Sequence, residues 1–130
     1  MATILIVEDN ATNMQLSSFL LESADYRVLT ATSAESGVAI AREQHPDLVL
    51  MDIQLPGMDG LQATALLKSD EVTRDIPVLA LTALAMKGDE ERIRAAGCDG
   101  YIAKPLDYKA FLAEVKATLA ARRYGAISRL

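Results

Sequence analysis

Cysteine and histidine are nearly absent from this sequence of 130 residues, which holds one of each and no tryptophan. The single cysteine, Cys98, has no second cysteine with which to form an internal disulfide, and this is compatible with a reducing cytoplasm. One cysteine and one histidine, His45, are also too few for a zinc site built from His and Cys ligands. We therefore expect a cytoplasmic protein whose chemistry depends on other side chains.

Long apolar runs are missing as well. No stretch approaches the roughly 18 residues that a membrane span needs. The first ten residues, MATILIVEDN, have no basic n-region and reach acidic residues at position 8, so we expect no signal peptide. The glycine spacings of P-loop and dinucleotide-binding enzymes are also absent. Membrane insertion and those two enzyme classes are thereby disfavoured.

The basic residues are unevenly distributed. Of the 13 lysines and arginines, three arginines lie in the last nine residues, RRYGAISRL, so residues 1–121 carry 10 basic against 18 acidic groups. Such an acidic body repels phosphate backbones, and we expect no direct nucleic-acid binding. The length predicts one domain over residues 1–121, followed by a short basic tail at 122–130 and no output domain.

Short apolar stretches alternate with helix-like segments from end to end of the chain. The expected strands are TILIV (3–7), RVLT (27–30), DLVLM (47–51), PVLAL (77–81) and GYIA (100–103). The alternation predicts an α/β fold, a doubly wound five-stranded parallel sheet in the flavodoxin-like order 2-1-3-4-5 with helices on both faces. Sheets of this kind bind their ligands at the carboxyl ends of the strands.

Charged and polar residues follow the expected strands at those ends. Glu8 and Asp9 follow the first strand, Asp52 the third, Thr82 the fourth and Lys104 the fifth. Two like charges about 4 Å apart cost roughly 4 kcal/mol at an effective dielectric constant of 20, so three carboxylates together favour a bound cation. Oxygen ligands suit a hard divalent ion such as Mg²⁺. A metal, a lysine and a hydroxyl converging on one carboxylate could stabilise a phosphoryl group attached to it.

Four motifs resemble those of response-regulator receiver domains of two-component signalling: VEDN (7–10), DLVLMDIQLPGMDG (47–60), LALTA (79–83) and YIAKP (101–105). The resemblance covers about residues 3–121. It implies that Asp52 accepts a phosphoryl group from a phosphohistidine on a partner. It also implies that Asp9, Asp52 and the Gln54 carbonyl bind Mg²⁺, or Mn²⁺ in its place, while Glu8 acts through water.

The same resemblance assigns the remaining site residues. Thr82, the N–H of Ala83 and Lys104 would contact the phosphoryl oxygens. Tyr101 would be the switch aromatic residue, and the Lys104–Pro105 peptide bond is expected to be cis. Phosphorylation would then alter the face formed by residues 85–96, 100–103 and 107–122. Residues 85–96 contain Gly88 and few large apolar residues, so this helix should be weakly held.

The stretch LTALAMKGDEERIRAAGCDGYIAKP (81–105) is more narrowly similar to stand-alone cell-cycle receivers, and also to receiver modules at the ends of hybrid histidine kinases. A single-domain response regulator that controls partner proteins is favoured. The alternatives are a hybrid-kinase or phosphorelay module that passes phosphate onward and a phosphorylation-independent adaptor. The expected partners are a histidine kinase or histidine phosphotransferase and a downstream regulatory protein, with the chain a monomer or weak dimer.

Two enzyme or carrier classes share the architecture but fit the residues less well. A haloacid-dehalogenase-type phosphatase normally has a second acid two residues after its aspartate, where this chain has Gln54. A flavodoxin-like carrier needs a phosphate loop after the first strand, where VEDN would repel the phosphate. We expect no turnover enzyme, but a domain that takes part in its own Mg²⁺-dependent phosphorylation. Leu84, two residues past Thr82, cannot orient an attacking water, so autodephosphorylation should be slow.

Overall fold

Five parallel strands form one sheet in the computed structural model, which describes residues 1–83, 87–104 and 106–128. The strand order is β2-β1-β3-β4-β5, and this confirms the predicted order. The strands are β1 (Thr3–Val7), β2 (Arg27–Ala31), β3 (Leu48–Asp52), β4 (Val78–Thr82) and β5 (Gly100–Ala103).

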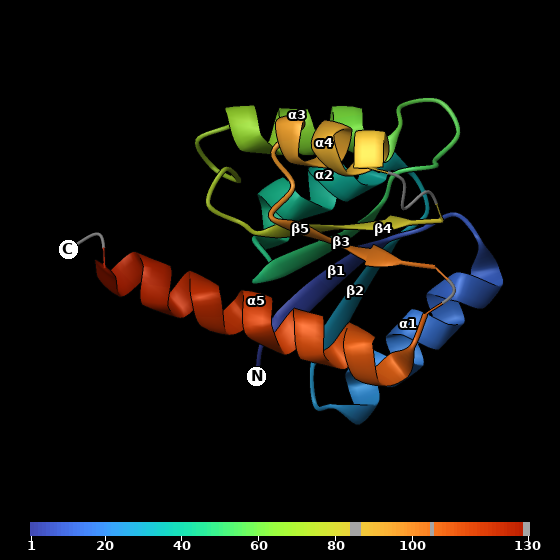
Figure 1. Cartoon of the computed structure of the whole chain (residues 1–130), viewed down its shortest axis with the longest axis vertical. Helices are drawn as coiled ribbons and strands as arrows, with labels where there is room; N and C mark the ends of the chain where they lie inside the picture. Colours follow the sequence, from blue (N-terminus) through green and yellow to red (C-terminus); the bar gives the residue numbers. More distant parts are fainter. Residues whose placement is uncertain (84–86, 105, 129–130) are drawn as a thin grey trace.

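Helices cover both faces of the sheet. They are α1 (Ala11–Ser23), α2 (Ala34–Gln44), α3 (Gly60–Ser69), α4 (Lys87–Ala95) and α5 (Tyr108–Ser128). Figure 1 shows α2, α3 and α4 on one face of the sheet and α1 and α5 on the other. The structure continues α5 through Ser128, past residue 121, where we expected the domain to end and a short basic tail to begin. None of the helices in the described ranges is long and apolar enough to cross a membrane.

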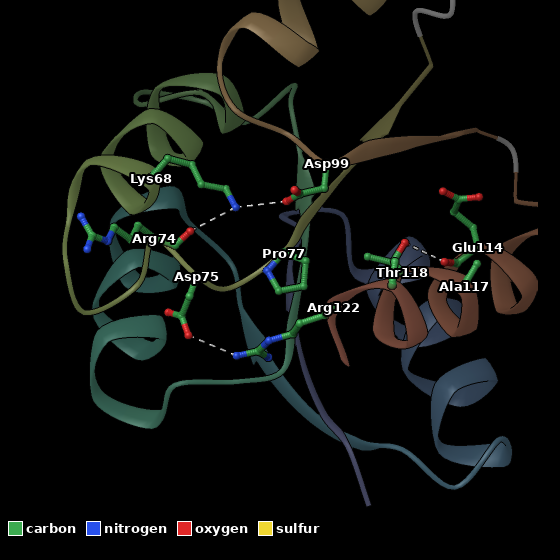
Figure 2. Close-up of a pocket in the computed structure, with 10 residues that line it drawn as sticks. Lys68, Arg74, Asp75, Pro77, Asp99, Glu114, Ala117, Thr118 and Arg122 are labelled. Atoms are coloured by element: carbon green, nitrogen blue, oxygen red, sulfur yellow. Dashed lines mark hydrogen bonds and ion pairs between the residues drawn. The ribbon is translucent and has the colours of Figure 1, made fainter. Parts of the chain in front are cut away.

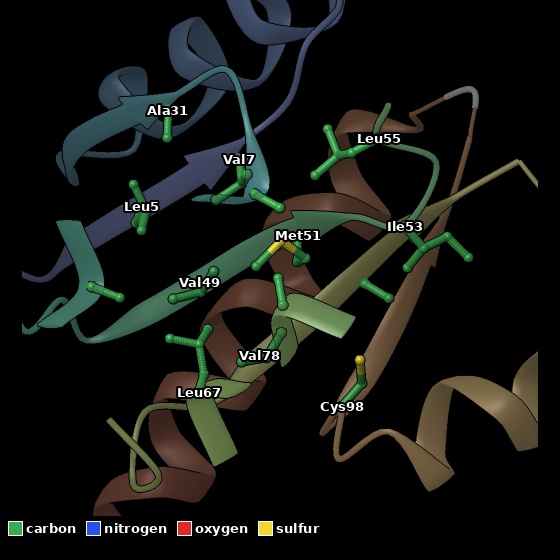
Figure 3. Close-up of a cluster of buried hydrophobic side chains, with 14 of the residues drawn as sticks. Leu5, Val7, Ala31, Val49, Met51, Ile53, Leu55, Leu67, Val78 and Cys98 are labelled. Atoms are coloured by element: carbon green, nitrogen blue, oxygen red, sulfur yellow. The ribbon is translucent and has the colours of Figure 1, made fainter. Parts of the chain in front are cut away.

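The central strands are buried because side chains on both of their faces pack under helices. Successive residues of β3 alternate between two apolar clusters: Val49 and Met51 face α2, α3 and α4, while Leu48 and Leu50 face α1 and α5. Figure 3 shows the first cluster, with Leu67 of α3 lying over the sheet. All five residues of β3 are buried, as expected for a parallel sheet covered on both faces. The strand that ends at Asp52 is therefore rigidly held.

Polar caps start the helices close to the ends of the strands. Asn10 accepts a hydrogen bond from the N–H of Asn13 at the start of α1, and Ser33 accepts one from Ser36 at the start of α2. Asp59 caps α3 in a reciprocal capping box with Gln62. These caps end the connecting loops at defined places, so the residues between strand and helix are held near the carboxyl edge of the sheet.

Phe111 of α5 and Phe19 of α1 provide a matched test of this core. Phe111 is fully buried, whereas Phe19 is 69% exposed. We expect Phe111→Ala to lower the free energy of unfolding by about 3–5 kcal/mol, because it leaves a cavity under the sheet. Phe19→Ala should change it by less than about 0.5 kcal/mol. Urea denaturation followed by circular dichroism measures both, and equal losses would contradict this packing.

Candidate functional site

The carboxyl ends of four neighbouring strands meet at one edge of the sheet. In the strand register, Val7 of β1 lies beside Met51 of β3, and Asp52 lies beside Leu81 of β4. Thr82 of β4 lies beside Ala103 of β5. The residues that follow these positions along the chain are therefore brought together, although they are as many as 96 positions apart in sequence.

Three carboxylates form a cluster at this edge. One oxygen from each of Glu8, Asp9 and Asp52 lies within 4.8 Å of the others. Glu8 and Asp52 are only 1% and 3% exposed, whereas Asp9 is exposed. Two acids are thus held away from water, and the third gives the cluster an opening to solvent.

Lys104 neutralises part of this charge. Its Nζ lies 3.0 Å from Glu8 Oε1 and 3.2 Å from Asp52 Oδ2, so one ammonium pairs with both buried acids. The backbone fixes the lysine in place, since the Lys104 N–H donates to the Thr82 carbonyl at 2.8 Å. The other Asp52 oxygen, Oδ1, accepts a hydrogen bond from the Gln54 N–H at 2.9 Å. Each carboxylate oxygen of Asp52 is therefore oriented by a hydrogen-bond donor.

The two buried acids respond differently to this environment. Burial, together with the adjoining Asp52 carboxylate, raises the pKa of Glu8, and Lys104 offsets only part of the effect. Burial by itself would raise the pKa of Asp52, but hydrogen bonding to Glu8, the Gln54 N–H and Lys104 outweigh it and lower that pKa. Burial likewise opposes the charge of Lys104, but the two carboxylates raise the pKa of Lys104. Without a metal, Asp52 is thus the buried acid that stays ionised most readily.

The donor set of the cluster fits a divalent metal. It offers carboxylate oxygens from Glu8, Asp9 and Asp52, and hard cations prefer oxygen ligands. One ammonium, that of Lys104, stands against three acids, so the cluster can accept further positive charge. Over the described parts of the chain, this is the one group of three or more acidic, His or Cys side chains placed to share an ion.

The predicted residues fall into three groups by position. Glu8, Asp9, Asp52, Gln54 and Lys104 are gathered into the cluster described above. Thr82 is buried at the end of β4, next to the backbone of Lys104, and Ala83 lies exposed just beyond it. Tyr101 of β5 is half-buried and packs against the apolar cluster under α2, α3 and α4. The expected cis bond involves Pro105, which lies outside the described residues.

The pairing of Lys104 with Glu8 was not anticipated from the sequence. The motifs predicted Lys104 as a phosphoryl contact and Glu8 as a residue acting through water, but not a direct bond between the two. Their separation in sequence gives no signal for this contact, because it depends on how far the lysine side chain reaches past the ends of β4 and β3. The close approach of Gly60 to the Asp52 backbone was missed as well.

A hollow lies at the opposite end of the sheet. It has a volume of about 700 Å³ and lies between α5 and the loop that leads into β4. Figure 2 shows Lys68 pointing toward Asp99, and Arg122 toward Asp75, across this hollow. Pro77 and Asp99 precede β4 and β5, so the hollow lies at the amino ends of those strands.

Two cations of this hollow, Lys68 and Arg122, bind acids and backbone carbonyl groups. Lys68 Nζ donates to the Ile76 carbonyl at 2.8 Å and to Asp99 at 3.1 Å. Arg122 donates to the Asp47 carbonyl at 2.8 Å and pairs with Asp75 at 3.4 Å. These contacts tie α3 and α5 to the loops at the amino ends of the strands. We interpret the hollow as a structural junction, since Lys68 and Arg122 already have partners.

Comparisons with known proteins agree with the geometry at the carboxyl edge. Residues 4–116 match the family described as the response regulator receiver domain. The polar-differentiation response regulator DivK of Brucella ovis is 50% identical over 117 residues, which cover 90% of this chain and 95% of that protein. DivK of Brucella anthropi is 48% identical with the same coverage. The similarity to stand-alone receivers expected from residues 81–105 is consistent with these relatives.

Two solved structures extend the comparison to three dimensions. The receiver domain of the sensor histidine kinase PA1611 from Pseudomonas aeruginosa superposes with a TM-score of 0.80 at 38% identity, over 91% of this chain and 93% of that one. That structure holds a magnesium ion in its active-site cleft. The chemotaxis protein CheY4 of Vibrio cholerae gives a TM-score of 0.86 at 26% identity, over 90% and 98% of the two chains.

Glu8→Gln tests the electrostatics of the cluster. The raised pKa of Glu8 means that ionised Glu8 is less favourable in the folded chain than in the unfolded chain. The stability linked to Glu8 is thus complete below its unfolded pKa, about 4.3, and is lost as the pH rises through the higher folded value. Glutamine does not titrate, so in the presence of EDTA we expect the variant to be more stable than wild type at pH 7.

The expected gain at pH 7 exceeds the roughly 0.5 kcal/mol typical of surface substitutions. It should shrink as the pH falls through the raised pKa of folded Glu8 and be gone below the unfolded pKa, about 4.3. Urea denaturation at pH 7, 5 and 4 measures it. Glu22→Gln, at an exposed position on α1, is the control and should show no such trend. A Glu8→Gln variant that is less stable than wild type at pH 7 would contradict the assignment of Glu8 as the disfavoured charge.

Proposed function

The chain belongs to the response regulator receiver domain family, and on that premise we propose that Asp52 accepts a phosphoryl group from a phosphohistidine on a partner protein. The main observation in support of the proposal is the burial of the Asp52 carboxylate and its preference for the ionised form. Asp52 is nearly buried at the end of a rigid strand, and its pKa is lowered by the groups around it. A nucleophilic carboxylate must be ionised, and this arrangement favours that state.

The proposed reaction is an in-line displacement at phosphorus. An Asp52 oxygen forms the new O–P bond while the P–N bond to the donor imidazole breaks, and the electron pair of that bond leaves with the imidazole. The Gln54 N–H and Lys104 hold the two carboxylate oxygens, so the nucleophile is oriented before the donor arrives. Phosphoryl transfer needs little beyond such positioning and charge stabilisation.

We assign the metal as Mg²⁺, with Mn²⁺ as a substitute, held by Asp9, Asp52 and the Gln54 carbonyl, with Glu8 acting through water. When bound, the ion supplies positive charge to the carboxylate and phosphoryl oxygens. The proximity of the three acids and the magnesium ion in the related PA1611 receiver support this assignment. Thr82, the Ala83 N–H and Lys104 are proposed to bind the phosphoryl oxygens, and the buried position of Thr82 beside Lys104 supports that role.

The proposed output is a change in the face formed by α4, β5 and α5. Phosphorylation draws Thr82 toward the phosphoryl group, and Tyr101 then packs further inward behind it. Two observations support such a switch. Tyr101 is only half-buried, and Ile93 is the one buried side chain among residues 88–95 of α4. A helix with so few buried contacts can change position at a small energetic cost.

The proposed partners are a histidine kinase or histidine phosphotransferase and a downstream regulatory protein, in the cytoplasm. The similarity to DivK favours a stand-alone regulator, while the similarity to the PA1611 receiver keeps a kinase-attached module as the second candidate. The residue on which we based slow autodephosphorylation, Leu84, lies outside the described residues, so that proposal rests on the sequence alone.

Phosphorylation by acetyl phosphate tests the role of Asp52. With Mg²⁺ present, we expect the wild-type chain to gain one phosphoryl group and Asp52→Asn to gain none, because an amide is not a nucleophile here. Intact-protein mass spectrometry and a gel that retards phosphorylated proteins measure the product. Asp107→Asn is the control, since Asp107 lies outside the site and asparagine can also accept the hydrogen bond at the start of α5. Full labelling of Asp52→Asn would refute the assignment.

Amide hydrogen exchange tests the switch. We expect residues 88–95 of α4 to exchange at least 10-fold faster than residues 111–119 of α5 in the free protein, because few α4 side chains are buried. The exchange rate of α4 should also change on phosphorylation. Beryllofluoride, a stable mimic of the phosphoryl group, allows the measurement over hours. Protection of α4 equal to that of α5, and unaltered by beryllofluoride, would contradict the proposal.

A further inference from the structure

Gly60, the first residue of α3, lies directly against the backbone that carries Asp52. A Cβ atom built at Gly60 would stand 2.2 Å from the Asp52 carbonyl oxygen, 2.8 Å from the Asp52 carbonyl carbon and 2.7 Å from Ile53 Cα. Real Cβ atoms essentially never approach other heavy atoms to within 3.0 Å. The hydrogen of glycine is therefore what allows α3 to pack this close to the end of β3.

The other glycines between residues 37 and 100 differ from Gly60 in what they approach. A Cβ at Gly37 would press on the Val7 side chain, and one at Gly97 on the Lys68 side chain, while Gly88 has nothing within 4 Å. Side chains can yield by rotating, but a main chain held in a sheet cannot. Of these six glycines, Gly60 is the one at which a side chain would have to displace backbone, and that backbone belongs to the site.

The first turn of α3 cannot easily retreat from this contact. Asp59 and Gln62 close a capping box around it, and the Gly60 carbonyl accepts a hydrogen bond from the fully buried Thr64 Oγ1 at 2.8 Å. On the other side, the Ile53 N–H donates to the Leu81 carbonyl in β4. A methyl group at residue 60 would thus be wedged between two anchored segments, and part of the displacement must fall on residues 52–54.

We infer that Gly60 is a positioning residue: its missing side chain sets where the Asp52 carboxylate and the Gln54 peptide stand relative to Asp9 and Lys104. The Gln54 N–H orients Asp52, and a Cβ at residue 60 would meet the backbone of Asp52 and of Ile53, the residue before Gln54. A shift of about 1 Å in a reacting group can cost up to about 100-fold in rate. The inference rests on the proposed function, since it concerns the metal and phosphoryl sites assigned there.

The test compares Gly60→Ala with two controls. Gly88→Ala makes the same chemical change in open space, and Val115→Ala removes core volume under the sheet face that carries α1 and α5. Isothermal titration with Mg²⁺ gives the dissociation constant, acetyl phosphate gives the phosphorylation rate, and circular dichroism confirms that each variant is folded at the temperature used. We expect Gly60→Ala to weaken Mg²⁺ binding and slow phosphorylation by about 10-fold or more. Both controls should stay within twofold of wild type, although Val115→Ala loses stability.

If Gly60→Ala is destabilised but matches Val115→Ala in Mg²⁺ affinity and phosphorylation rate, Gly60 is a packing residue and the inference is wrong. If Gly60→Ala does not fold, Thr64→Val carries the test. It removes the hydrogen bond to the Gly60 carbonyl at nearly constant volume, and it should weaken Mg²⁺ binding at least threefold; an unchanged affinity overturns the inference. A wild-type chain that neither binds Mg²⁺ nor becomes phosphorylated would instead refute the proposed function.

Discussion

The paired contacts of Lys104 with Glu8 and Asp52 are the interaction on which the rest of this structure depends. Two carboxylates that are almost fully buried would be strongly destabilising without a counter-charge, and loss of the counter-charge that compensates a buried ion typically costs about 3–5 kcal/mol. The lysine reaches both acids because β5 places it beside β4, while β1 and β3 place the acids next to each other. The strand order therefore brings Lys104 close enough to neutralise part of the charge of the two buried acids.

The apolar packing of β3 fixes the position of the polar site at the end of this strand. A strand buried along its whole length cannot shift its register without exposing apolar side chains, so Asp52 has one position along the sheet. The core therefore supplies the energy that holds unfavourable charges together, and those charges create a place where a divalent cation is favourable. In the proposed reaction, pre-organisation of this kind reduces what the chain must rearrange when a phosphodonor arrives.

The sequence was sufficient to predict the strand order and the carboxyl-edge location of the acids, because both follow from apolar runs and from where each run ends. It was insufficient for contacts that depend on side-chain reach or on how closely two backbones approach. The bond from Lys104 to Glu8 and the packing of Gly60 on Asp52 are of this type. The extension of α5 to Ser128 was also not expected, because the three arginines of residues 122–130 favoured a short basic tail.

The two ends of the sheet differ in how their charges are used. At the amino ends of the strands, Lys68 and Arg122 are engaged with fixed acids and carbonyl groups, so that end resists change. At the carboxyl ends, the acids outnumber the lysine that pairs with them, and a bound cation would relieve that imbalance. In the proposed switch, ligand binding at the carboxyl edge shifts the weakly packed α4, while the contacts at the opposite end hold the amino ends of the strands in place.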